Sequence, residues 1–195
     1  MVKLSSVCVY CGSALGQAPA YRAAAARLGA LLAARRITLV YGGGGVGLMG
    51  VLAQAVLQDG GQVVGVIPRF LLRVEKGVRE LTRLEAVDSM HERKERMFAL
   101  ADGFIVLPGG FGTLDETFEI ITWKQLGLHD KPIAVIDVDG YWEPLRRLSE
   151  HIIAAGFAPE RARHLFRLVP DAEAALAALA EAPTPAVPSA APERL

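Results

Sequence analysis

Short apolar runs that alternate with amphipathic segments constrain the fold of this chain more than any other feature. The runs have the length of buried strands, and the segments between them carry apolar residues at helical spacing. This order predicts an α/β fold, a doubly wound, Rossmann-like parallel sheet with helices on both faces. We expect strands at 6–10, 37–41, 62–67, 84–87, 103–107, 132–137 and 165–169, and helices at 19–35, 46–58, 89–101, 114–126, 141–155 and 171–181.

The pattern fits one domain that covers residues 1–181. The connection 69–82 has no clear period and is expected to be a loop or an irregular helix. The tail 182–195 carries four prolines and little large apolar surface, so we expect it to be disordered. In such a fold, ligands bind at the carboxyl ends of the strands, which directs attention to the turns that follow them.

Composition narrows the choice of partners and location. The formal net charge is +0, which gives no reason to expect a nucleic-acid surface. No apolar stretch approaches the ~20 residues of a membrane span, so no membrane partner is expected. No secretory cleavage pattern follows Lys3, and a cytoplasmic location is predicted. Cys8 and Cys11 form a C-x-x-C motif that could be a redox pair, although the position of Cys8 inside an apolar run favours a buried thiol. The cysteines and histidines lack the spacing of metal ligands, so no metal site is predicted.

The segment 107–116, LPGGFGTLDE, joins an expected strand to a helix expected from Leu114. The N–H groups and the positive end of a helix N-terminus favour an anion such as phosphate. Gly109, Gly110 and Gly112 allow the backbone to approach that anion closely. Because Glu116 follows one turn later, the segment suggests chemistry on a nucleotide or a sugar phosphate.

A second glycine cluster, YGGGGVGLMG at 41–50, also follows a strand and opens a helix. The expected dinucleotide acid after the next strand is missing, and so are the Lys and Ser/Thr of a P-loop, which argues against NAD and ATP. A phosphate- or ribose-binding loop that includes Gly43 and Gly44 is favoured. The alternative is close packing of helix on strand.

A third cluster opens the helix expected at 89–101. Ser89 and Glu92 have the spacing of a capping box. Arg93 lies on or near the face that carries Met90 and Met97, and an inward arginine needs an anionic partner. Arg93 is therefore a candidate ligand for a phosphate or a carboxylate.

Two interpretations of Glu116 stay open at this stage. Thr113 and Glu116 have the spacing of a capping box, in which the carboxylate only fixes the start of the helix. Alternatively, Glu116 and Glu119, which lie on one side of the helix, act with Arg93 beside a phosphate. That set suits cleavage of a glycosidic bond, in which one acid stabilises an oxocarbenium-like state or activates water.

Together these clusters resemble the Lonely Guy family of cytokinin riboside 5′-monophosphate phosphoribohydrolases, which was long mislabelled as lysine decarboxylases. The family signature P-G-G-x-G-T-x-x-E is met at 108–116, and its Met-His-x-Arg-Lys context is met at 90–94. The segments 7–13, 41–50, 121–123 and 127–132 are similar as well. The resemblance extends over roughly residues 7–157.

The resemblance implies hydrolysis of an N6-substituted adenosine monophosphate to a free base and ribose 5-phosphate, without a metal or redox cofactor. It implies that Arg93 and Glu116 form the catalytic pair. The nucleotide site would be lined by Lys94, Gly109, Gly110, Phe111, Gly112, Thr113, Leu114, Asp115 and Thr122. Glu75 is a candidate for an acidic residue that the family has in the 69–82 connection.

The resemblance also implies a homodimer in which a partner helix completes each pocket. The helix expected at 114–126 supports this expectation, because apolar side chains occupy nearly all of its sides and need burial on more than one face. These side chains are Ile120, Ile121, Trp123 and Leu126.

The leading hypothesis is therefore a nucleoside-monophosphate N-glycosidase, and the alternative is a non-catalytic nucleotide-binding module of the same fold. A carrier would not need Arg93 and Glu116 beside its phosphate loop. Lysine decarboxylation is disfavoured, because pyridoxal phosphate chemistry needs a Schiff-base lysine and neither glycine loop contains one. The sequence leaves open whether AMP or an isopentenylated AMP is the substrate.

Overall fold

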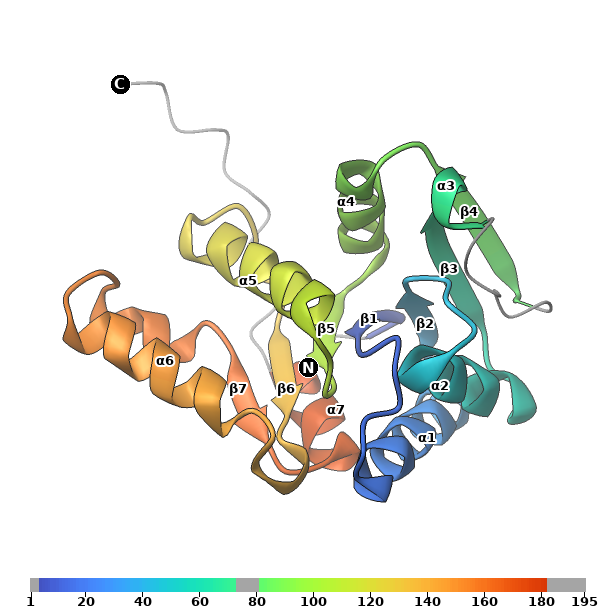
Figure 1. Cartoon of the computed structure of the whole chain (residues 1–195), viewed down its shortest axis with the longest axis horizontal. Helices are drawn as coiled ribbons and strands as arrows, with labels where there is room; N and C mark the ends of the chain where they lie inside the picture. Colours follow the sequence, from blue (N-terminus) through green and yellow to red (C-terminus); the bar gives the residue numbers. More distant parts are fainter. Residues whose placement is uncertain (1–3, 73–80, 182–195) are drawn as a thin grey trace.

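The computed structural model describes residues 4–72 and 81–181, so Glu75 and the tail 182–195 lie outside the described residues. Within these ranges the chain forms a seven-stranded sheet in the order β4-β3-β2-β1-β5-β6-β7, and every strand pair is parallel (Figure 1). The predicted fold class is confirmed. The strands are β1 (Ser6–Tyr10), β2 (Thr38–Tyr41), β3 (Val63–Pro68), β4 (Arg83–Val87), β5 (Gly103–Val106), β6 (Ile133–Ile136) and β7 (Arg167–Val169).

Helices cover both faces of the sheet and create two cores (Figure 1). Helices α1 (Pro19–Ala34), α2 (Gly47–Gln58) and α7 (Ala172–Ala180) cover one face, and α4 (Met90–Leu100), α5 (Phe111–Gln125) and α6 (Glu143–Ala154) cover the other. The remaining elements are the short helix α3 (Arg69–Leu72) and the 3₁₀ turns η1 (Val138–Gly140) and η2 (Glu160–His164). Among the described helices, none has the length and apolar character needed to cross a membrane.

Alternation along β1 explains the two cysteines. Successive side chains of a strand point to opposite faces, so Cys8 within β1 packs in the core beneath α4 and α5. Cys11, the residue after the end of β1, packs in the core beneath α1 and α2. Both thiols are free, and burial raises the pKa of each. The interpretation of Cys8 as a buried thiol is confirmed, and the pair has neither the pKa nor the placement of a redox motif.

Helices α5 and α6 begin more than one residue away from the expected position. Helix α5 begins at Phe111, three residues before the predicted start, and Gly110 is its N-cap. Helix α6 begins at Glu143 because η1 forms a tight turn first, with Asp139 and Gly140 at φ 52° and 76°. The Ser89 half of the expected capping box is confirmed, since its hydroxyl accepts a hydrogen bond of 3.1 Å from the backbone N–H of Glu92. The Glu92 carboxylate in turn accepts from the N–H of Asp88 at 2.8 Å, one residue before the N-cap.

Strand β1 lies at the point where the strand order reverses. The chain runs outward from β1 through β2 and β3 to β4, and it returns to the other side of β1 with β5. Loops that leave neighbouring strands in opposite directions open a crevice at their carboxyl ends. The fold therefore predicts a ligand site where the loop after β1 meets the loop after β5.

Candidate active site

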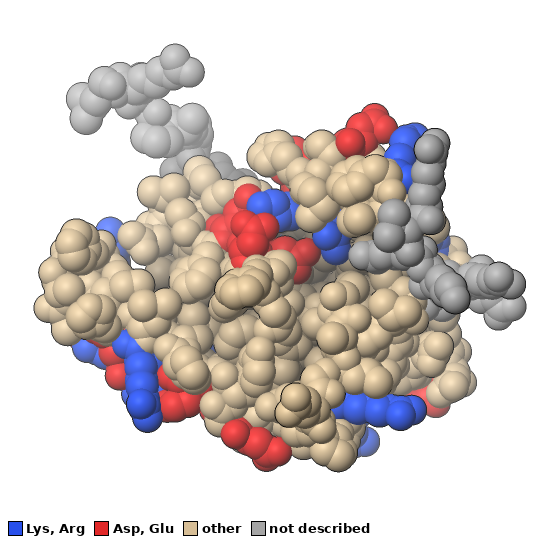
Figure 2. Space-filling model, in the orientation of Figure 1, with Lys and Arg blue, Asp and Glu red and all other residues tan. Residues whose placement is uncertain are grey.

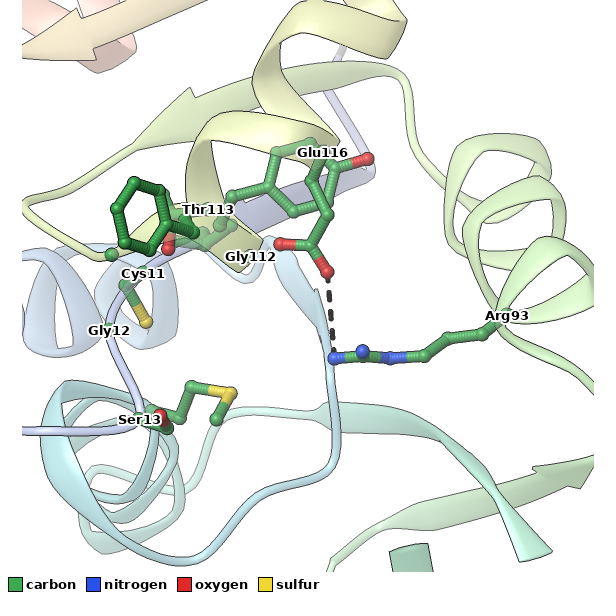
Figure 3. A pocket seen from close by; sticks show the side chains of 12 residues that line it. Cys11, Gly12, Ser13, Arg93, Gly112, Thr113 and Glu116 are labelled. Atoms are coloured by element: carbon green, nitrogen blue, oxygen red, sulfur yellow. Dashed lines mark ion pairs between the residues drawn. The ribbon is translucent and has the colours of Figure 1, made fainter. Parts of the chain in front are cut away.

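A cavity of about 220 Å³ lies at this crevice, between the loop after β1, the start of α5 and the side of α4 (Figure 3). The loops are joined at its base, where the N–H of Gly12 donates to the carbonyl of Pro108 at 3.0 Å. The cavity is lined by Val9, Tyr10, Cys11, Gly12, Ser13, Met49, Arg93, Gly110, Phe111, Gly112, Thr113 and Glu116.

The N-terminus of α5 presents free backbone donors to this cavity. The first helical hydrogen bond runs from the N–H of Leu114 to the carbonyl of Gly110, at 3.0 Å. Within residues 4–72 and 81–181, the N–H groups of Gly110, Phe111 and Gly112 have no acceptor. Unpaired N–H groups at the positive end of a 15-residue helix are groups that favour an anion.

Close packing and open space alternate among the glycines of this loop. A Cβ on Gly109 would lie 2.1 Å from Thr113 Oγ1, so only glycine fits there. At Gly110 and Gly112, by contrast, a Cβ would meet nothing within 4 Å. The loop thus packs tightly at Gly109 and leaves room for a ligand beside the next two glycines.

Arg93 and Glu116 face each other across the cavity, as Figure 3 shows. Arg93 extends from α4, and its Nη2 lies 3.5 Å from Oε1 of Glu116. The two side chains are only 11% and 10% exposed. The Arg93 Nε also donates to the carbonyl of Val66 at 3.3 Å, which anchors the guanidinium to the end of β3. The predicted inward position of Arg93 is confirmed, and its anionic partner is a carboxylate of the protein.

Burial raises the pKa of Glu116 to about 7, and the nearby Arg93 guanidinium opposes this rise. Asp115 adds a smaller upward contribution. A carboxyl group with a pKa near neutrality changes its charge easily at the pH of a cell. Such a group in a cavity is a candidate for proton transfer or for stabilising a developing positive charge.

The capping-box interpretation of Glu116 is wrong. A capping box needs Thr113 at the N-cap position, but Thr113 is the third residue of α5 and Gly110 occupies the N-cap without a side-chain bond. Glu116 therefore lies in the second turn, where its side chain turns into the cavity toward Arg93. Glu116 is therefore buried beside Arg93 in the cavity, and it does not cap the helix.

A second group of charges ties α4 to α5 beside the cavity (Figure 2). The Lys94 Nζ lies 3.2 Å from Asp115 and 3.0 Å from Glu119. Burial lowers the pKa of Lys94, but its hydrogen bonds to these two carboxylates outweigh that effect and the pKa is raised. Of the other residues predicted to bind substrate, Leu114 lines an apolar groove next to the cavity and Thr122 lies farther along α5.

The second glycine cluster supports the site from behind. A Cβ on Gly42 would lie 2.0 Å from the Arg93 Nη2, so this glycine makes room for the guanidinium. Gly43, at φ 79°, packs against Ile67, and both Gly43 and Gly44 are buried. The cavity lining given above includes neither of them, and their predicted role in binding substrate stays a prediction.

The start of α2 is already occupied by the chain itself. The N–H groups of Leu48 and Met49 donate to the carbonyl of Gly12, at 3.0 and 3.3 Å. These two amides are therefore not free donors for a phosphate at the second glycine cluster. The amides of Gly110, Phe111 and Gly112 at the start of α5, by contrast, have no acceptor among the described residues.

Sequence reasoning missed the part of the cavity that β1 and α2 provide. Tyr10, Cys11, Gly12 and Ser13 line it from the carboxyl end of β1, and Met49 lines it from α2. The signal was present, because β1 is the first strand and flanks the reversal of strand order in most doubly wound sheets. Among the described residues, no three His, Cys, Asp or Glu side chains gather in a way that could hold a metal ion.

Comparison with known proteins gives a family model and several sequence relatives. Residues 49–179 match a family model described as "Possible lysine decarboxylase". The chain is 49% identical over 166 residues to a "Probable cytokinin riboside 5′-monophosphate phosphoribohydrolase" of Oryza sativa subsp. japonica, which covers 85% of this chain and 73% of that protein. It is 44% identical over 171 residues to a cytokinin riboside 5′-monophosphate phosphoribohydrolase of Arabidopsis thaliana, which covers 88% of this chain and 80% of that protein.

A solved structure with the same fold is the Moco carrier protein of Chlamydomonas reinhardtii. It superposes with a TM-score of 0.69 at 17% identity, over 92% of this chain and 97% of that chain. At this identity the likeness concerns the fold alone.

Proposed function

The chain belongs to the Lonely Guy family of cytokinin riboside 5′-monophosphate phosphoribohydrolases, and from this premise we propose that it hydrolyses the N-glycosidic bond of an adenosine 5′-monophosphate, with or without an N6 substituent. The products are a free base and ribose 5-phosphate. The observation that carries the proposal is the buried Arg93–Glu116 pair, which lies in one cavity with the open helix start of α5.

The 5′-phosphate is assigned to the N-terminus of α5. The free N–H groups of Gly110, Phe111 and Gly112 can donate to its oxygens, and the hydroxyl groups of Ser13 and Thr113 line the same cavity. Placing the phosphate there directs the ribose toward the second turn of the helix, where Glu116 lies.

Glu116 acts on the ribosyl centre. As the bond from C1′ to the base nitrogen breaks, its electron pair leaves with the base and positive charge develops on the ribose. The ionised carboxylate of Glu116 stabilises that charge and accepts a proton from the water whose oxygen bonds to C1′. The base takes up a proton from solvent as it leaves, and Glu116 afterwards returns the proton of the water to solvent, which restores the ionised carboxylate. Arg93 favours the ionised form of Glu116, and its own charge is available to the anionic substrate.

The test is a comparison of substrates. The purified protein is incubated with AMP, isopentenyl-AMP and adenosine, and the released base is followed by chromatography. We expect release from one or both monophosphates with a specificity constant far above that for adenosine, because remote phosphate binding contributes to the rate as well as to KM. Nucleotide binding without release would favour the non-catalytic module, and equal constants for adenosine and AMP would contradict the phosphate assignment.

We also propose a homodimer that covers the outer surface of α5. Phe111, Leu126 and Leu128 are 91%, 66% and 64% exposed, although they lie at the two ends of a helix beside the site. Large apolar side chains that are exposed in this way favour burial, and a twofold partner can supply it. Light scattering should give twice the chain mass at micromolar concentration, and a monomer at that concentration would contradict the proposal. The cytoplasmic location stays a prediction.

A further inference from the structure

Tyr141 contacts the glycine-rich loop at 108–112, before and at the start of α5, from outside the Arg93–Glu116 cavity. Its hydroxyl donates a hydrogen bond of 2.6 Å to the carbonyl of Gly109. Tyr141 and Gly109 both line the two neighbouring cavities, of about 240 and 460 Å³, whereas the lining of the Arg93–Glu116 cavity includes Gly110 and neither of them. The hydrogen bond thus draws the Gly109 carbonyl to the side of the loop that faces away from the reaction.

The protein holds Tyr141 in place with several local devices. The η1 turn, with Asp139 and Gly140 in left-handed conformations, brings the chain back toward the loop. Asp137 Oδ1 accepts a bond of 2.6 Å from the backbone N–H of Trp142, which fixes the residue that follows. The Tyr141 ring also packs edge-on against Tyr21, with the ring centroids 5.4 Å apart. These contacts place the Tyr141 hydroxyl against the Gly109 carbonyl.

The geometry of the Gly109–Gly110 peptide links the Tyr141 hydrogen bond to the direction of the Gly110 N–H. In a trans peptide, the carbonyl of one residue and the N–H of the next point in opposite directions, and the described chain contains no cis peptide. If Tyr141 holds the Gly109 carbonyl outward, the N–H of Gly110 must point inward. From this we infer that Tyr141 is a positioning residue, which keeps the Gly109–Gly110 peptide turned so that the Gly110 N–H can bind the substrate phosphate. The inference rests on the proposed function.

This peptide needs such a restraint because glycine stands on both sides of it. Turning the plane over would move φ of Gly110 from −92° to about +90°, a region that glycine enters at little cost. The turned peptide would present a carbonyl oxygen to the phosphate and repel it. Glycine at position 110 also means that no side chain restricts the motion, since the position borders open space.

The experiment compares Tyr141→Phe with Tyr21→Phe. Tyr21 packs against Tyr141 in the same cavity, and its hydroxyl has no hydrogen bond within the described residues. Binding of inorganic phosphate and of ribose 5-phosphate is measured by calorimetry, and kcat and KM are measured for AMP. We expect Tyr141→Phe to weaken both anions and to raise KM about three- to tenfold, the scale of one net hydrogen bond. We expect Tyr21→Phe to bind as the wild type does.

A rescue variant separates peptide orientation from a general loss of structure. Alanine in place of Gly110 disfavours the turned peptide, because a side chain destabilises positive φ. The loss of phosphate affinity caused by Tyr141→Phe should therefore shrink in a Gly110→Ala background. An equal loss in both backgrounds, or Tyr141→Phe binding that matches Tyr21→Phe, would overturn the inference alone. A wild-type protein that binds neither anion would overturn the proposed function together with it.

Discussion

Replacing Glu116 with glutamine should abolish turnover and yet make the folded protein more stable at alkaline pH. The substitution keeps the size of the side chain and a carbonyl acceptor, but it removes the charge that stabilises a ribosyl cation. We expect kcat to fall by a factor of about 10²–10⁴, the usual scale for one acid–base group. The substitution lowers turnover but raises stability at alkaline pH, because it removes a carboxylate that is ionised while buried.

The magnitude follows from the pKa of Glu116. Folding raises this pKa from an ordinary 4.5 to about 7. Stability that comes from a raised pKa is fully present below the unfolded pKa and is lost as the pH rises through the folded pKa. When the carboxylate is ionised in both states, the loss is about 3 kcal/mol, from roughly 1.36 kcal/mol for each pH unit. Glutamine does not titrate, so the Glu116→Gln variant avoids this loss.

The assay is urea unfolding of both proteins at pH 5 and pH 8.5. The stability of the Glu116→Gln variant relative to the wild type should rise by roughly 2–3 kcal/mol between these pH values. Arg93 loses its carboxylate partner in the variant, but arginine stays charged across this range and its penalty is the same at both values. The comparison of two pH values therefore isolates the titration of Glu116.

Glu143→Gln is a control, because folding shifts the pKa of Glu143 in the opposite direction to that of Glu116. Hydrogen bonds from Arg146 and Arg147 lower the pKa of the exposed Glu143 to about 2. Its contribution to stability is present above the unfolded pKa and is lost only as the pH falls toward 2, so this variant should show no gain at pH 8.5 over pH 5. Our reasoning on Glu116 is refuted if the difference in the free energy of unfolding between the Glu116→Gln variant and the wild type is the same at both pH values. It is also refuted if the variant keeps near-normal turnover.

Three further expectations test the surroundings of Glu116. Gly42→Ala should change the free energy of unfolding by no more than about 1 kcal/mol, but it should push the Arg93 guanidinium away and lower kcat/KM on the order of 10²-fold. The kinetic effect should vanish in an Arg93→Ala background. Unfolding curves and steady-state kinetics check these two expectations. The kcat/KM for AMP should rise with pH through the pKa of Glu116, and Arg93→Gln should move that rise to higher pH because Arg93 lowers this pKa; an unmoved pH profile would contradict the pairing. Treatment with a chelator should leave the rate unchanged, and a loss that added metal restores would show that a metal takes part.

The sequence sufficed for the architecture because the information is local and periodic. Each apolar run coincides with a strand to within two residues at either end, and the alternation of strand and helix leaves a parallel sheet as the simplest arrangement. The boundaries at 111 and 143 were missed for a physical reason. Gly110 and the η1 turn set them through backbone geometry, and neither leaves an apolar period to detect.

The site was predictable in its residue types but not in its connections. Arg93 and Glu116 are 23 positions apart in the chain. The resemblance implied that they act as a pair, but the spacing of residues did not, and their contact is seen only once α4 and α5 are placed. The same holds for Lys94, which the resemblance placed at the substrate and which the structure places between Asp115 and Glu119. The spacing of residues within one helix does not tell which side chains of another helix they contact.

The glycine run at 42–45 shows why residue type and role have to be separated. Taken as a sequence, four glycines after a strand suggest a cradle for phosphate. In the structure, Gly42 leaves space for a guanidinium, and the start of α2 donates to Gly12. The cluster therefore acts through protein groups: Gly42 leaves the space in which Arg93 reaches Glu116, and the amides of Leu48 and Met49 hold the loop after β1 that lines the cavity. If this view is correct, a methyl group at position 42 should cost activity with Arg93 present and nothing with Arg93 absent, whereas a direct phosphate cradle would lose activity in both backgrounds.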